Sequence, residues 1–208
     1  MKIAGLILAG GSSIRMGGID KGLLLLDGKP LVEHVFNQIN LHISKLFISA
    51  NRNSEKYSIY GSVLHDNKNL GSFLGPLGGI AAAMSVWTGQ LLVIMPCDSP
   101  FFYSCLIKRL ILTAEKENAS LVVASCNKKR QPVFMVANIK LLSNLETYLI
   151  RKNRKVRLWQ DMVGVREVDC SDFPTAFLNI NTFNDFNQSK AIIRSNVVNH
   201  SNLPNRDH

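Results

Sequence analysis

A glycine-rich segment near the start of the chain has the composition of an anion-binding loop. It runs from Leu8 to Lys21 and contains Gly10 and Gly11 side by side, followed by Arg15. Adjacent glycines let successive backbone N–H groups turn toward an anion such as phosphate. Arg15 adds a planar fork of donors, and Lys21 adds a compact point charge. The spacing fits neither G-x-G-x-x-G nor G-x-x-x-x-G-K-[ST]. The segment predicts a triphosphate site, and the alternative is a surface loop with two solvated cations.

Asp98 is the candidate metal ligand. It follows the apolar run 91–95 and lies in the sequence Pro96-Cys97-Asp98-Ser99-Pro100. A carboxylate at the carboxyl end of a strand, opposite a glycine loop, is well placed to hold Mg²⁺ against phosphate oxygens. The alternative is a simple turn, because Asp before Ser-Pro is favourable turn chemistry.

Asp66 is a further candidate site residue, expected after the short strand around Val63, and Gly78 and Gly79 follow it in the chain. A carboxylate can accept hydrogen bonds from both the N1–H and the exocyclic amine of guanine, which cytosine does not offer together. The two glycines would let a base approach the backbone closely. The alternatives are an ordinary loop carboxylate at Asp66 and tight packing of a helix on the sheet at the glycines.

Asn179 and Asn181 form a third candidate group. Side chains two residues apart on an extended segment point to the same side, so both asparagines would face the same way. The alternative is a helix start, because Thr182 and Asp185 have the spacing of a capping box.

Two basic stretches remain. Residues 151–157 hold five cations in seven positions, including Arg154 and Lys155, and residues 128–130 hold three more. The functional interpretation of the first stretch is capture of a phosphate, and the alternative is a solvated face. A nucleic-acid site has no support, since no aromatic residues alternate with these cations.

The elements that must position these residues alternate between strands and helices. Apolar runs ending in glycine or turn residues indicate buried strands, and apolar residues at helical spacing indicate helices. The alternation predicts an α/β fold with three layers, a Rossmann-like open and mostly parallel sheet with helices on both faces. The expected strands are 3–8, 46–50, a short one around Val63, 91–95, 121–125, 133–137 and 165–168, and the expected helices are 31–39, 76–87, 106–114, 141–150 and one starting at Thr182.

Right-handed crossovers would place the carboxyl end of every strand at one edge of this sheet. Ligands in such folds bind beyond that edge. The sequence therefore predicts that four places meet there: the loop after Leu8, the region of Asn51, Asp66, and the segment 96–98.

Composition narrows the class of protein. The 208 residues include 24 basic and 15 acidic side chains, for a net charge of +9, and 46% are hydrophobic. This is globular and basic, as expected of a protein that meets anions. No apolar run approaches the ~18 residues of a membrane helix, and the short apolar start after Met1-Lys2 is interpreted as a strand and not as a secretory signal. The four cysteines have no metal spacing and are expected to be free thiols in a reducing, cytoplasmic compartment.

The string Leu8-Ala9-Gly10-Gly11, with Arg15-Met16-Gly17 and Lys21 after it, resembles the signature of nucleotidyltransferases that activate sugars, isoprenoid precursors and molybdopterin. The continuations 17–24 and Asp27-Gly28-Lys29-Pro30-Leu31 narrow the resemblance to the molybdenum cofactor guanylyltransferase family. It extends from Ile3 to about Phe186. The fold it implies is that of the nucleotide-diphospho-sugar transferases.

The resemblance also implies roles for particular residues. GTP would be bound by Leu8, Ala9, Gly10, Lys21, Asp66 and Asp98, with Mg²⁺ as cofactor on Asp98 and with Arg15, Lys21 and Asp98 as the catalytic residues. Asn179, Asn181, Arg154 and Lys155 would serve the acceptor, molybdopterin. Some members have Asn where this chain has Ser49, so no GTP contact is assigned to Ser49.

The implied reaction is transfer of GMP from GTP to molybdopterin. Other molybdenum cofactor biosynthesis proteins and target molybdoenzymes are the candidate partners, with no nucleic acid and no membrane. We expect one domain over residues 1–195, with a nucleotide half up to about 100, an acceptor half after it, and a disordered tail over 196–208. Two alternatives stay open: a related enzyme using CTP or a sugar phosphate, which nucleotide selectivity would reveal, and a basic nucleic-acid-binding module, which would show a steep salt dependence.

Overall fold

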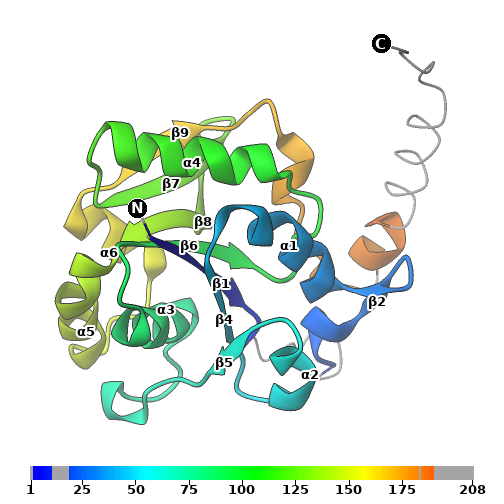
Figure 1. The fold of residues 1–208 in the computed structure, drawn as a ribbon, viewed down its shortest axis with the longest axis horizontal. Coiled ribbons are helices and arrows are strands. Elements are labelled where there is room, and N and C mark those ends of the chain that lie inside the picture. The colour runs from blue at the N-terminus through cyan, green and yellow to red at the C-terminus, as the bar shows by residue number, and fades with distance from the viewer. Residues whose placement is uncertain (1, 11–18, 183, 190–208) are drawn as a thin grey trace.

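The centre of the fold is a seven-stranded sheet in the order β5-β4-β1-β6-β8-β7-β9 (Figure 1). The computed structural model describes residues 2–10, 19–182 and 184–189. Among these residues no helix is long and apolar enough to cross a membrane. The strands of the sheet are β1 (Ile3–Leu8), β4 (Lys45–Ser49), β5 (Ser62–Leu64), β6 (Leu91–Pro96), β7 (Leu121–Cys126), β8 (Lys129–Asn138) and β9 (Arg166–Asp169).

The expectation that every strand would end at the same edge is wrong for β8. This strand runs antiparallel to both β6 and β7, whereas β1 pairs in parallel with β4 and β6, and β7 pairs in parallel with β9. The physical reason is the connection between β7 and β8, which consists of Asn127 and Lys128 alone, both with positive φ. Such a two-residue hairpin can join only antiparallel strands. The sheet is therefore mostly parallel, as predicted, with one reversed strand.

Helices cover both faces of the sheet, so the three-layer prediction is confirmed. Alternate residues of β1 face opposite layers, with Ile7 in the core under α1 and α4 and Leu6 in the core under α3 and α5. Figure 1 shows these two pairs of helices on opposite sides of the strands. The helices are α1 (Leu31–Ile39), α2 (Ser54–Ser58), α3 (Pro76–Val86), α4 (Ser104–Lys116), α5 (Leu142–Ile150) and α6 (Val156–Val163).

Three elements were not predicted. These are the short helix α2, the hairpin of β2 (Leu25–Leu26) with β3 (Lys29–Pro30), and the helix α6. Helix α6 begins inside the basic stretch 151–157 and buries Trp159 completely. The high local charge conceals this helix, because only its apolar side packs against the core.

The capping box at the last helix is confirmed. The Thr182 hydroxyl accepts a hydrogen bond of 3.1 Å from the backbone N–H of Asp185, and the Asp185 carboxylate accepts one of 2.8 Å from the backbone N–H of Thr182. Residues 184–189 follow as a helix. Asp185 also accepts a hydrogen bond of 3.0 Å from the backbone N–H of Asn181, so the box fixes the segment that leads into this helix.

Candidate active site

A cavity of about 610 Å³ opens at the carboxyl edge of the parallel strands. All four places expected at this edge contribute to it. Hydrogen bonds between neighbouring segments continue just past the strand ends, because the backbone N–H of Ala9 donates to the carbonyl of Ser49 and that of Cys97 donates to the carbonyl of Leu8. Of the predicted site residues, the lining includes Leu8, Ala9, Gly10, Lys21, Asp66, Asp98 and Asn179; the other lining residues are Ser49, Asn51, Phe73, Leu74, Gly75, Pro76, Pro96, Cys97 and Val133.

Lys21 connects three segments of this site. Its Nζ atom donates a hydrogen bond of 2.7 Å to Oδ1 of Asn181 and lies 3.8 Å from Oδ2 of Asp98. Its side chain is 18% exposed, so the ammonium group faces the cavity and is only partly hydrated. A cation in such surroundings attracts an anion more strongly than one on the open surface.

Asp98 lies at the end of β6, a strand whose six residues are all buried. Burial raises the pKa of its carboxyl group, and the neighbouring Lys21 partly offsets this rise. The segment 179–181 is attached beside it: the backbone N–H of Ile180 donates to the Asp98 carbonyl at 2.8 Å, and the Ser99 hydroxyl donates to Oδ1 of Asn179 at 2.5 Å. The predicted acceptor residues Asn179 and Asn181 therefore lie next to the predicted metal ligand.

Asp66 lies at the opposite end of the cavity, after β5. Its carboxylate accepts a hydrogen bond of 3.1 Å from the Asn51 side chain, whose oxygen accepts one of 3.2 Å from the Asp66 backbone. A Cβ atom at Gly78 would come within 2.7 Å of Oδ1 of Asp66, and one at Gly79 within 2.3 Å of the Ser49 hydroxyl. Both glycines of α3 are thus needed for close packing against the strand ends, the second of the two roles expected for them.

Other predicted residues lie outside this arrangement. Arg15 falls outside the described residues. Arg154 donates to the carbonyls of Leu149 and Asn153 at 2.8 and 2.7 Å, and Lys155 accepts a hydrogen bond at its carbonyl from Tyr148. Neither Arg154 nor Lys155 lines the cavity.

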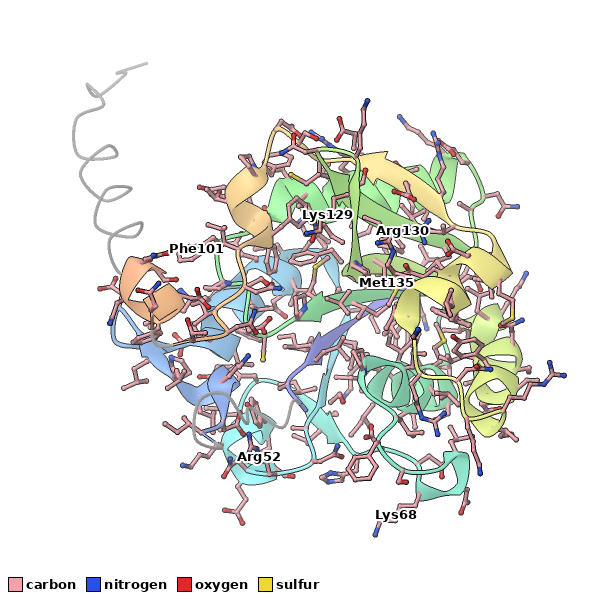
Figure 2. All side chains as sticks on the ribbon, turned by 180° about the vertical axis from the view of Figure 1, so that it is seen from behind. Arg52, Lys68, Phe101, Lys129, Arg130 and Met135 are labelled. Carbon is pink, nitrogen blue, oxygen red and sulfur yellow. The ribbon has the colours of Figure 1, made fainter. Side chains whose placement is uncertain are left out.

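The second basic stretch is partly neutralised. Arg130 at the start of β8 forms ion pairs of 2.6 Å with Asp161 and 2.7 Å with Glu167. Figure 2 labels Lys129, Arg130 and Met135, which all belong to β8. Because its charge is already paired, Arg130 stabilises the contact between α6, β8 and β9 and is not available to a ligand.

Phe73 is a site residue that the sequence analysis missed. It is 96% exposed, has a φ of 52°, and lines the cavity next to the buried Leu74. Gly71 and Gly75 on either side also have positive φ. A phenylalanine in this region of φ is uncommon and marks a constrained loop. The signal in the sequence was a single aromatic residue within Gly-Ser-Phe-Leu-Gly, directly before a helix.

The donor set at Asp98 fits Mg²⁺. Within the described residues, no three His, Cys, Asp or Glu side chains gather into a metal-binding group. These residues therefore offer no site that would bind a metal through protein ligands alone. Mg²⁺ in nucleotide sites takes one or two carboxylates and completes its shell with phosphate oxygens and waters. A single carboxylate, 23% exposed at the cavity, matches that need.

Comparison with known proteins places the chain among the nucleotidyltransferases. The family described as "MobA-like NTP transferase domain" matches residues 5–164. The molybdenum cofactor guanylyltransferase of Shewanella sediminis is 37% identical over 182 residues, which are 88% of this chain and 92% of that protein. The enzyme of the same name from Photobacterium profundum is 40% identical with the same coverage. The chain belongs to the molybdenum cofactor guanylyltransferase family. It is therefore a nucleotidyltransferase, and the resemblance found in the glycine-rich segment is confirmed.

Solved structures agree on the fold. The molybdopterin-guanine dinucleotide biosynthesis protein A of Archaeoglobus fulgidus superposes with a TM-score of 0.77 at 20% identity, over 94% of this chain and all of that one. A CMP:2-keto-3-deoxy-manno-octonic acid synthetase superposes with a TM-score of 0.71 at 13% identity, also over 94% of this chain and all of that one. The nucleotide-diphospho-sugar transferase fold is thus shared even where the sequences have diverged.

Proposed function

We propose that this protein transfers GMP from GTP to molybdopterin and releases pyrophosphate. The observation that carries the proposal is the meeting of Lys21, Asp98 and Asn181 at one end of the cavity, in a chain 37–40% identical to molybdenum cofactor guanylyltransferases. In the reaction, an oxygen of the molybdopterin phosphate forms a bond to the α-phosphorus of GTP. The bond from that phosphorus to the bridging oxygen breaks, and pyrophosphate leaves with the electron pair. The attacking phosphate is already ionised near neutral pH, so the reaction needs no general base.

The chain's own residues would bind and align the nucleotide. The backbone of Leu8, Ala9 and Gly10 lines the cavity between Asp66 and Asp98, so a nucleotide lying along it would have its base at Asp66 and its phosphates at Lys21. The Asn51 side chain fixes the orientation of the Asp66 carboxylate, which would then accept from the N1–H and amine of guanine. Arg15 is proposed as a second cation for the triphosphate. Alignment and charge neutralisation account for most of the catalysis in phosphoryl transfer.

Asp98 would hold Mg²⁺. When bound, the metal neutralises charge on the phosphate oxygens and on the departing pyrophosphate. Lys21, whose Nζ atom lies 3.8 Å from the Asp98 carboxylate, would contribute a second positive charge. The two residues together would keep the triphosphate in one conformation.

The acceptor is proposed to bind on the side of Asn179 and Asn181, with Arg154 and Lys155 as further contacts to its phosphate. Residues 1–195 would act as one domain, with a nucleotide half up to about 100 and an acceptor half after it. All four cysteines are free thiols, which supports a reducing, cytoplasmic setting. Other molybdenum cofactor biosynthesis proteins and target molybdoenzymes are the proposed partners.

The test is product formation by the purified protein. GTP, molybdopterin and Mg²⁺ are incubated with it, and both pyrophosphate and molybdopterin guanine dinucleotide are measured. We expect the two products in equal amounts, dependence on Mg²⁺, and much less product from CTP. Equal or greater turnover with CTP would replace the guanylyltransferase assignment by a cytidylyltransferase one. Pyrophosphate without the dinucleotide would overturn the choice of acceptor.

A further inference from the structure

We propose that Asp20 and Tyr57 are positioning residues that hold the backbone of Lys21 in place for the transfer reaction. The proposal rests on the function proposed above, because Lys21 is the residue on which they would act. Neither Asp20 nor Tyr57 lines the cavity, so their effect would reach the substrate only through Lys21.

Asp20 is a buried carboxylate, 9% exposed, and three side chains from the segment around α2 surround it. Oδ1 accepts a hydrogen bond of 2.5 Å from the Tyr57 hydroxyl, and Oδ2 accepts one of 2.9 Å from the Asn53 amide. The guanidinium of Arg52, labelled in Figure 2, lies 3.7 Å from Oδ2 and donates to the carbonyl of Ile19. A buried carboxylate is tolerated only when such partners compensate for its lost hydration.

Gly22 supplies the contact on the other side of Lys21. It is buried, and a Cβ atom there would come within 2.4 Å of the Tyr57 hydroxyl oxygen. The absence of a side chain at Gly22 therefore lets the backbone lie directly against Tyr57. Both neighbours of Lys21 thus contact the same tyrosine, one through a hydrogen bond and the other through close packing.

Tyr57 is itself well fixed. Its side chain is fully buried in the core formed with α1 and α4, and α2 has only five residues. A helix this short is not stable on its own, so the burial of Tyr57 anchors α2 to the core. The contacts of Tyr57 with Asp20 and Gly22 then hold residues 20–22, at the end of the glycine-rich segment, in a fixed place relative to the core.

This arrangement matters because a lysine side chain is flexible. Its four methylene groups and three donors allow many positions of Nζ for a given backbone. The observed contacts of Lys21 Nζ with Asn181 and Asp98 require the backbone to start from one place. A displacement of about 1 Å at a reacting group can cost up to ~100-fold in rate.

The experiment compares Tyr57→Phe with Tyr60→Phe. The second variant is a matched control, because the Tyr60 hydroxyl also donates to a carboxylate, that of Glu33, at 3.1 Å, and Tyr60 does not line the cavity. Both variants lose one oxygen atom and one hydrogen bond. We expect Tyr57→Phe to lower kcat for dinucleotide formation about tenfold with less than a threefold change in KM for GTP, and Tyr60→Phe to leave both unchanged.

The deciding measurement repeats Tyr57→Phe in a Lys21→Ala background. If Tyr57 acts through Lys21, the residual kcat of Lys21→Ala falls by less than twofold when Tyr57→Phe is added. A further tenfold loss would show that Tyr57 acts on the protein as a whole and would overturn the proposal, as would full activity of the single variant. Tm is measured for every protein.

Asn53→Gly provides a second variant if Tyr57→Phe does not fold. Asn53 has a φ of 52°, which glycine adopts without strain, so this change removes the amide that binds Asp20 and little else. We expect a drop of about threefold to tenfold in kcat, again absent in the Lys21→Ala background. Unchanged kcat would overturn the proposal. A wild-type protein that forms no dinucleotide would instead contradict the proposed function, so the two failures are distinguishable.

Discussion

Lys21 donates a hydrogen bond of 2.7 Å to the side chain of Asn181, although 160 residues separate them in the sequence. Lys21 is the last residue of the glycine-rich segment, and Asn181 precedes the capping box of the last described helix. The same Nζ atom lies 3.8 Å from Oδ2 of Asp98, so the bond brings the segment of Asn181 to the part of the site that holds Asp98. The first and last parts of the described chain are therefore both needed to build this site.

Replacing Asn181 by alanine tests this relationship. Asn181→Ala removes the side-chain oxygen that accepts the hydrogen bond of the Lys21 ammonium, so we expect Nζ to shift and turnover to fall about tenfold. Asn187→Ala is the matched control, because Asn187 is exposed in the same C-terminal region. Steady-state rates of dinucleotide formation measure the effect. Equal rates for the two variants would remove Asn181 from the site.

Asp98→Asn should lose turnover without losing the fold. We expect kcat to fall about a hundredfold or more over a full Mg²⁺ titration, because the amide is a weaker metal ligand. Burial raises the pKa of Asp98 in the folded protein, so the protonated carboxyl group favours the folded state and the charged one disfavours it. The stability that the protonated group contributes is present at low pH and is lost as pH rises through the raised pKa. The Tm of the ligand-free variant at neutral pH should therefore equal or exceed that of the wild type. Asp27→Asn, at an exposed turn, is the control; a large drop in Tm for Asp98→Asn alone would indicate a structural role.

Asp185 should give the protein a pH-dependent stability of the opposite sign. The backbone N–H of Asn181 and the Thr182 side chain lower the pKa of its carboxyl. A lowered pKa gives stability that is present above the ordinary aspartate pKa and is lost as pH falls through the depressed one. Asp185→Asn should therefore lower the midpoint of denaturation at pH 7. The difference in midpoint between the variant and the wild type should shrink toward pH 2–3, which is about the limit of the carboxylate's titration. A difference that stays constant with pH would contradict this origin.

Nucleotide selectivity should appear as selective thermal stabilisation. With Mg²⁺ present, we expect GTP to raise Tm more than ATP, CTP or UTP, because selective binding to the folded state raises its apparent stability. Asp66→Asn should reduce the advantage of GTP and leave the shift by the other nucleotides nearly unchanged. Equal shifts by all four nucleotides on the wild type would contradict guanine recognition.

Arg154 and Lys155 together test where the acceptor phosphate binds. The double variant Arg154→Gln with Lys155→Gln should weaken molybdopterin binding by about tenfold to a hundredfold, the usual value of a charge-assisted contact, with GTP affinity unchanged. Arg154 also bonds to two backbone carbonyls next to α5, so Tm should fall as well. Arg151→Gln with Lys152→Gln, two exposed positions of the same stretch, is the control. Unchanged molybdopterin affinity would leave Arg154 with its structural role alone.

The sequence by itself determined the layers of the fold and most of the site. Continuous apolar runs such as 91–95 indicated buried strands, and the strand-helix alternation placed their polar ends at one edge. Leu8, Asp66 and Asp98 were predicted to meet there, and they line one cavity. These inferences succeed because they depend on local periodicity and on a general rule of parallel sheets.

Only the tertiary structure decided which distant side chains touch. The contacts of Lys21 with Asn181 and of Asp20 with Tyr57 have no signature in local periodicity. A hydrogen bond between distant segments depends on where the whole core places two backbones and how their side chains point. That information exists only once the chain has folded, because no window of sequence contains both partners.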